Sequence, residues 1–119
     1  MLSHYRSQFL NNTYIVIITR GLAEMTCIGT AFGASPLTFL GLAGVGDLFL
    51  TCSSSNSRNY TVGYRLGKGE SLDKIMTTLG SVAEGISTTK GVKTIIDELG
   101  LSAPIASSVS SWFSSLLSC

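Results

Sequence analysis

Apolar side chains recur at helical spacing along most of the chain. One clear example has apolar residues at positions i, i+3, i+4 and i+7, the spacing of one helix face, at Val45, Leu48, Phe49 and Cys52. The same spacing returns within residues 71–80, 92–100 and 104–116. No convincing strand pattern is present, since even residues 15–18 continue into helical spacing. The sequence therefore predicts an all-α domain of about six helices.

Residues with known capping preferences bound several of these helices. A serine hydroxyl can accept a backbone N–H at a helix start, glycine can take the left-handed conformation after a helix end, and proline suits the first turn. We expect helices to begin at Ser57, Ser71 and Pro104, and to end at Gly67 with Gly69, at Gly80 and at Gly100.

A longer apolar stretch, from about residue 14 to residue 31, predicts a central helix. Arg20 and Glu24 lie four residues apart, so they share one stripe of this helix. We expect this stripe to stay polar and the rest of the helix to be buried. Residues 1–13, with the single histidine His4, are predicted to form a separate, frayed tail.

Length and composition add constraints. A chain of 119 residues fits one domain, which should bury roughly 65% of the surface of its unfolded form. Only 13% of the residues are charged, against roughly 25% in a usual soluble domain. We therefore expect a partner domain or a homodimer contact to cover part of the surface. The net charge of +1 gives no reason to expect a nucleic-acid partner.

Two uncharged stretches, 25–46 and 99–119, are long enough to cross a bilayer. Glycine, proline, serine and threonine interrupt them, and no secretory signal is evident, so we expect a soluble, cytoplasmic protein without a membrane span. The three cysteines, Cys27, Cys52 and Cys119, form no C-x-x-C pair, and one histidine cannot build a His-rich site. We expect no metal site.

The segment 41–47, Gly-Leu-Ala-Gly-Val-Gly-Asp, places three glycines beside a carboxylate. Glycines allow another backbone or a ligand to approach closely, so Asp47 is a candidate site residue. The alternative is a tight helix entry, in which Asp47 favours the positive end of the helix dipole. The residues alone leave both interpretations open.

A basic segment follows, in which Ser57, Arg58 and Asn59 precede Arg65 and no acid occurs from residue 58 to residue 69. Arg58 and Arg65 lie seven apart, so they share a helix face. Guanidinium groups beside the free N–H groups of a helix N-terminus suit a phosphate. A solvated basic face is the alternative.

One more candidate is Glu84, an isolated acid between two predicted helices. It is either a helix cap or surface charge, or part of a site.

Four motifs in order carry a family resemblance. They are Ile18–Met25 (ITRGLAEM), Gly41–Leu48 (GLAGVGDL) followed by Thr51 and Cys52, the triplet Ser57–Asn59, and Glu84–Gly85. Together they resemble the C-terminal domain of bacterial-type glycerol-3-phosphate dehydrogenase over roughly residues 15–104. We expect residues 14–119 to form this domain and residues 1–13 to lie outside the resemblance.

The resemblance implies the reversible reduction of dihydroxyacetone phosphate to sn-glycerol 3-phosphate, with NAD or NADP as cofactor. It implies that the substrate is bound by Asp47, Ser57, Arg58 and Asn59, and that the cofactor is contacted by Arg58, Val82 and Glu84. In such proteins a Rossmann domain upstream binds the cofactor, and a lysine handles the proton.

The chain departs from the family in lacking G-x-G-x-x-G after a strand and in having no lysine at the catalytic position. We therefore assign no catalytic residue, expect the missing Rossmann domain as a partner, and predict that the chain alone is inactive. The alternative hypothesis is a non-catalytic helical interaction or dimerisation module derived from the enzyme.

Overall fold

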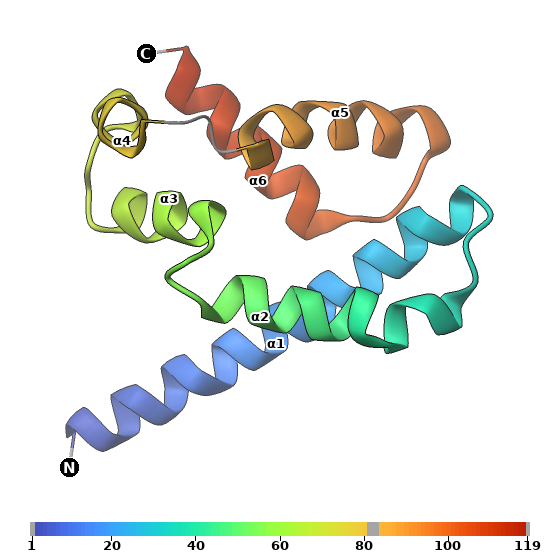
Figure 1. Ribbon diagram of the computed structural model, residues 1–119, viewed down its shortest axis with the longest axis horizontal. Coiled ribbons are helices and arrows are strands. Elements are labelled where there is room, and N and C mark those ends of the chain that lie inside the picture. Colours follow the sequence, from blue (N-terminus) through green and yellow to red (C-terminus); the bar gives the residue numbers. More distant parts are fainter. Residues whose placement is uncertain (1, 81–83, 119) are drawn as a thin grey trace.

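The computed structural model describes residues 2–80 and 84–118, with the backbone alone for residues 2–7 and 9–11. Every regular element in these ranges is helical, which confirms the predicted all-α class (Figure 1). The α-helices are α1 (Leu2–Ala31), α2 (Asp47–Ser53), α3 (Arg58–Gly67), α4 (Leu72–Leu79), α5 (Glu84–Leu99) and α6 (Pro104–Leu117). A 3₁₀ helix, η1 (Pro36–Leu40), and a π-helix, η2 (Leu42–Gly46), precede α2.

The helix ends follow the predicted local signals. The Oγ of Ser57 accepts the backbone N–H of Tyr60 at 3.3 Å, and the Oγ of Ser71 accepts that of Lys74 at 3.4 Å. Gly80 and Gly100 follow α4 and α5 with φ of 64° and 63°, a conformation that costs other residues energy. These boundaries are therefore determined by residues within one helical turn.

The first helix is longer than predicted, because α1 begins at Leu2 rather than near residue 14. Residues 2–13 contain neither glycine nor proline, so nothing in them interrupts helical hydrogen bonding. His4 thus belongs to the helical backbone rather than to a separate tail.

The expected distribution of polarity along α1 is wrong. Glu24 is buried, with 4% of its surface exposed, whereas Ile15, Val16 and Ile17 are 57%, 66% and 53% exposed. The reason is tertiary: the Glu24 carboxylate accepts backbone N–H groups at the start of α6. Glu24 therefore faces the protein while Arg20 stays exposed, and the apolar side chains of residues 15–17 face outward.

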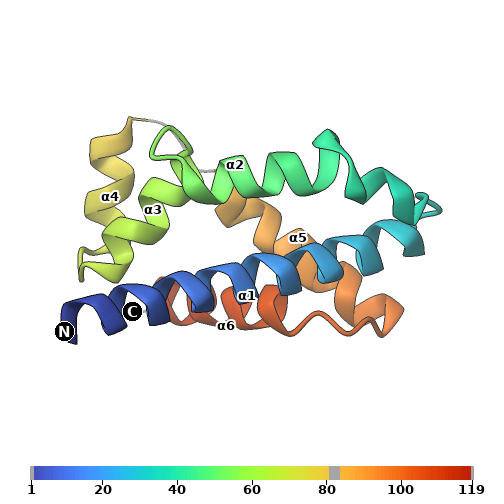
Figure 2. The same ribbon diagram turned by 90° about the horizontal axis from the view of Figure 1, so that it is seen from below.

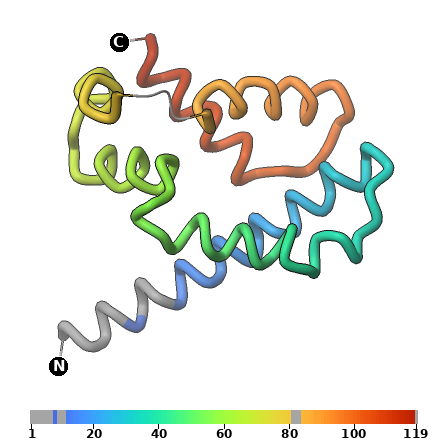
Figure 3. Tube along the Cα trace, viewed as in Figure 1, coloured from blue at the N-terminus to red at the C-terminus, as the bar shows by residue number. Residues whose placement is uncertain are grey.

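The helices form two pairs, α3 with α4 and α5 with α6, which meet at the main core. Helices α5 and α6 form a hairpin, and α3 packs against α4, while α1 contacts α2, η1 and α6 (Figures 1 and 2). The main core is small, with Val62, Leu66 and Ile75 at its centre and Phe113 packed against it. The Cα trace places the α3–α4 pair and the turn after α1 at opposite ends (Figure 3).

Much apolar surface stays exposed. The radius of gyration is 15.6 Å, against about 13.5 Å for a compact domain of this length. The accessible surface is 8174 Å², against about 6200 Å² for a monomer of this mass. Among the most exposed apolar side chains are Leu37, Leu40, Leu42 and Leu50. This surface agrees with the expectation that another domain or chain covers part of the molecule.

One helical segment, Asn12–Ala31, is long and apolar enough to cross a bilayer by length and composition alone, with a mean hydropathy of 1.2. This segment is not one of the two uncharged stretches, 25–46 and 99–119, considered in the sequence. A core helix of a soluble protein passes the same test, and this segment contains Glu24, which contacts α6. It is weak evidence for a membrane span.

Candidate functional site

The glycine-rich segment before α2 is shaped by its own backbone. A Cβ at Gly44 would lie 2.2 Å from the carbonyl oxygen of Phe39, so only glycine fits there without a shift. Helical structure already begins at Leu42, and the N–H of Asp47 donates to the carbonyls of Leu42 and Gly44. Asp47 is still the first residue of α2 and the acid of its first turn, as the helix-entry interpretation expects, although η2 continues directly into this helix.

The carboxylate of Asp47 is exposed. Within the described ranges, no ion pair or side-chain hydrogen bond involves it, and none joins it to Arg58. Asp47 begins α2, and the rest of this seven-residue helix separates it from the turn that leads to Ser57. This length corresponds to about 9 Å along the helix. Convergence of Asp47 and Arg58 on one ligand stays a prediction.

The triplet 57–59 stands at the start of α3. Ser57 uses its hydroxyl to cap the helix, and Arg58, the first helical residue, is exposed. No acid pairs with Arg58 in the part of the chain that the structure describes. Its guanidinium therefore lies beside the positive end of a ten-residue helix and can take an anion there.

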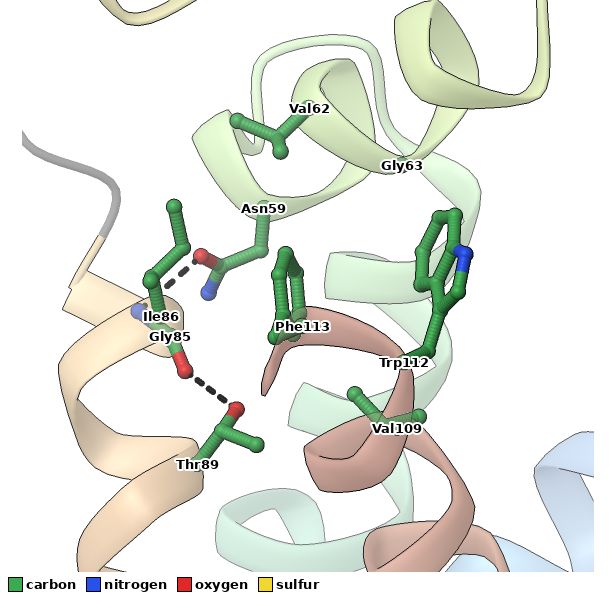
Figure 4. Close-up of a pocket in the computed structure, with 9 residues that line it drawn as sticks. All are labelled: Asn59, Val62, Gly63, Gly85, Ile86, Thr89, Val109, Trp112 and Phe113. Carbon is green, nitrogen blue, oxygen red and sulfur yellow. Dashed lines mark hydrogen bonds between the residues drawn. The ribbon is translucent and has the colours of Figure 1, made fainter. Parts of the chain in front are cut away.

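Asn59 joins this triplet to the start of α5. Its Oδ1 accepts the backbone N–H of Gly85 at 3.2 Å, across 26 residues of sequence (Figure 4). Glu84, the first residue of α5, is exposed beside this contact. Val82, the other predicted cofactor residue, lies outside the described residues. The structure thus places Asn59, a substrate-binding candidate, against the helix start that carries Glu84, a cofactor-binding candidate.

Two pockets, each of about 380 Å³, meet at Asn59. The first lies between α3, α5 and α6, and Val62, Ile86, Trp112 and Phe113 make most of its lining apolar (Figure 4). The second lies between α1, α2 and α3 and is lined by Tyr14, Thr51, Cys52, Asn59, Tyr60, Gly63 and Tyr64. Asp47 and Arg58 line neither of these two pockets.

Burial raises the pKa of the Cys52 thiol in the second pocket. A raised pKa keeps the thiol protonated near neutral pH, and a protonated thiol is a poor nucleophile and metal ligand. Cys52 is therefore not a candidate nucleophile or metal ligand in this pocket.

Arg65 does not share an anion site with Arg58. Its Nε pairs with the carboxylate of Glu70, and its Nη1 donates to the Oγ1 of Thr78 at 2.6 Å. The interpretation of a two-arginine phosphate site is wrong, because Arg65 holds α3 against α4. The acid responsible stands one residue beyond the acid-free segment that suggested the site.

Comparison with known proteins identifies the relatives of this arrangement. The family model described as NAD-dependent glycerol-3-phosphate dehydrogenase C-terminus matches residues 3–115. The chain belongs to this family. The resemblance inferred from the four sequence motifs is therefore confirmed.

Individual members of the glycerol-3-phosphate dehydrogenase family agree with this assignment. The chain is similar to glycerol-3-phosphate dehydrogenase [NAD(P)+] of Teredinibacter turnerae, with 57% identity over 80% of this chain and 28% of the relative. The corresponding protein of Lawsonia intracellularis is 55% identical over 82% of this chain and 28% of its own length. The chain thus spans about 28% of the length of these relatives.

A solved glycerol-3-phosphate dehydrogenase also shares the fold. The crystal structure of the enzyme from Coxiella burnetii superposes with a TM-score of 0.74 and 36% sequence identity. The match covers 77% of this chain and 28% of that chain. The helical arrangement is therefore that of one part of a glycerol-3-phosphate dehydrogenase.

Sequence reasoning misses two features of this family domain. Glu24 falls in the first motif, and the helical pattern predicts that it is solvated, although it binds α6. The motif that contains Gly85 points only to Glu84, although Gly85 lies against Asn59. The sequence signal for Glu24 is an acid inside an otherwise apolar helix. No sequence signal indicates the contact of Gly85 with Asn59.

Proposed function

We propose that this chain is the substrate-binding part of an NAD(P)-dependent glycerol-3-phosphate dehydrogenase. It acts with a cofactor-binding Rossmann domain in the cytoplasm and interconverts dihydroxyacetone phosphate and sn-glycerol 3-phosphate. The observation that carries the proposal is the family match, together with the contact that joins Asn59 to the start of α5.

The phosphate end of the substrate is assigned to Ser57, Arg58 and Asn59. A phosphate dianion favours a guanidinium and the N–H groups at a helix N-terminus, and Arg58 has no competing acid among the described residues. The exposed position of Arg58 agrees with a ligand that lies between this chain and a second domain.

The carbonyl end of the substrate is assigned to a position near Asp47. Reduction adds a hydride to the carbonyl carbon and a proton to its oxygen, and a lysine from outside this chain supplies the proton. A carboxylate near that lysine holds the amine in position and favours its protonated form. Asp47 suits this role because its carboxylate is exposed and unpaired within the described ranges.

The cofactor is assigned to Arg58, Val82 and Glu84. Bound NAD(P)H supplies the hydride. Arg58 can pair with a cofactor phosphate, and the carboxylate of Glu84 can accept hydrogen bonds from hydroxyl groups. Both side chains are exposed at helix starts that the Asn59–Gly85 contact joins, so the described residues fit a cofactor shared with another domain.

Reconstitution tests the proposal. The full chain is joined behind the N-terminal domain of the Teredinibacter turnerae relative, and NADH oxidation with dihydroxyacetone phosphate is followed by absorbance. We expect turnover from the fusion and none from the chain alone. Turnover by the chain alone, or an inactive fusion that is folded and binds NADH, would contradict the proposal.

A second candidate is a non-catalytic interaction module, which the exposed apolar surface favours. Light scattering and a pull-down against a full-length dehydrogenase separate the two. A stable, soluble assembly of the chain on its own supports the module. Aggregation on its own, relieved by the cofactor-binding domain, supports the enzyme part.

A further inference from the structure

The hydrogen bond between Asn59 and Gly85 determines which atom of the Asn59 amide is bonded to α5 and which atom is left for a ligand. The Gly85 backbone N–H can only donate, so the atom that meets it at 3.2 Å must be the side-chain oxygen. This assignment does not depend on the ambiguity between amide oxygen and nitrogen that affects other asparagines. The amide nitrogen is therefore the group left for other partners.

The nitrogen is the branch of the amide that does not bond to the Gly85 N–H. In Figure 4 the Asn59 oxygen makes the bond to Gly85, and the nitrogen lies beside it in a side chain that lines the first pocket. An amide nitrogen carries two N–H donors and accepts nothing. A ligand group that contacts Asn59 from this side must therefore present hydrogen-bond acceptors.

Gly85 also leaves no room for a side chain. A Cβ at this position would lie 2.6 Å from the Asn59 Oδ1 and 2.9 Å from its Cγ. The obstructing atoms belong to the end of a side chain, so an added methyl group displaces the Asn59 amide and leaves the backbone in place. Gly85 thus controls where the Asn59 amide lies.

We propose that Gly85 is a positioning residue that holds the Asn59 amide with its N–H donors toward the substrate, and so selects a phosphate oxygen over a donor group. The inference rests on the proposed function, since it takes Asn59 as a substrate contact. It couples the two halves of the site, because movement of the α5 start, where the cofactor candidates lie, moves the Asn59 amide as well.

Two variants and a control test this role in the full chain. Gly85→Ala displaces the amide. Asn59→Asp keeps an acceptor for the Gly85 N–H but presents a second anionic oxygen to the ligand. Gly91→Ala is the matched control, because it makes the same substitution in the same helix and its Cβ would meet nothing within 4 Å.

Trp112 reports binding, because it is the only tryptophan and lines the same pocket as Asn59. Its fluorescence is titrated at low protein concentration with glycerol 3-phosphate, and with glycerol for comparison. We expect about tenfold weaker glycerol 3-phosphate binding in Gly85→Ala, the loss of about one hydrogen bond. Asn59→Asp should lose about 100-fold, and Gly91→Ala should change affinity less than twofold.

Thermal unfolding separates positioning from folding. The melting temperature of Gly85→Ala should lie within a few degrees of that of Gly91→Ala. A purely structural role of Gly85 would instead lower both the stability and the affinity of Gly85→Ala. Weaker binding in Asn59→Asp with unchanged binding in Gly85→Ala would overturn the positioning role and leave the proposed function standing. No saturable binding by the unaltered chain would overturn the substrate site itself.

Discussion

The carboxylate of Glu24 accepts the backbone N–H of Ile105 at 2.8 Å, 81 residues away in sequence. Its other oxygen accepts the N–H of Ala106 at 3.0 Å, and Arg20 lies 3.9 Å from the first. Glu24 therefore caps α6 from α1, where no residue of α6 itself does so, because Ala103 at the N-cap has no side-chain acceptor. The charge also lies at the positive end of the α6 dipole.

Replacing Glu24 tests the strength of this contact. Glu24→Ala leaves two part-buried backbone N–H groups without acceptors and should lower the free energy of unfolding by about 2 kcal/mol. Glu24→Gln keeps one acceptor oxygen and should cost about half as much. Glu98→Ala, at an exposed acid in α5, is the control and should stay within about 0.5 kcal/mol. Urea unfolding followed by circular dichroism measures all three, and equal effects of Glu24→Ala and Glu98→Ala would contradict the capping role.

Gly29 in α1 provides a second stability prediction. A Cβ at this position would lie 2.1 Å from the Cζ of Phe39, so Gly29→Ala forces the ring and η1 away from α1. We expect a loss of about 1–3 kcal/mol. Gly21→Ala in the same helix meets nothing within 4 Å and should stabilise by up to about 1 kcal/mol, because alanine is the better helix former. Thermal unfolding of the two variants checks the opposite signs.

The exposed apolar surface predicts self-association of the isolated chain. Leu37 and Leu42 are 75% and 90% exposed, so replacing both with serine removes apolar area without opening a cavity. The double variant should associate less, as measured by light scattering against concentration, and its stability should change by less than about 1 kcal/mol. Ile75→Ser is the contrasting case: Ile75 is fully buried, so this variant should unfold. Unchanged association in the double variant would show that the surface around Leu37 and Leu42 does not mediate self-association.

The helix ends could be predicted from sequence, because their causes are local. Ser57 and Ser71 bond within their own first turns, and Gly80 and Gly100 take positive φ directly after their helices. Hydrophobic spacing identified the helices for the same reason, since residues three and four apart share a face in any helix.

The contacts between helices could not be predicted in this way. Periodicity marks an apolar face but does not say which helix covers it, so the bonds of Glu24 to α6 and of Arg65 to Thr78 were missed. The contact of Asn59 with Gly85 likewise depends on how α3 and α5 pack. The site residues came instead from the family resemblance, which carries tertiary information that spacing lacks.

The phosphate assignment separates two arginines that look equivalent in the sequence. Arg58 is exposed and has no acid partner among the described residues, whereas Arg65 is held by Glu70 and Thr78. Only Arg58 can therefore turn its guanidinium to a ligand at the start of α3. The variants Arg58→Ala and Arg65→Ala remove the same charge from the same helix and differ only in this respect.

The most direct measurement is the dissociation constant of glycerol 3-phosphate for the full chain and for these two variants, taken from Trp112 fluorescence. Arg58→Ala should weaken binding about 10- to 100-fold, the contribution of a charge-assisted hydrogen bond. Arg65→Ala should bind within about twofold of the unaltered chain and lose stability instead. Equal affinity of the unaltered chain and Arg58→Ala would contradict the assignment of this chain as the substrate-binding part of the enzyme.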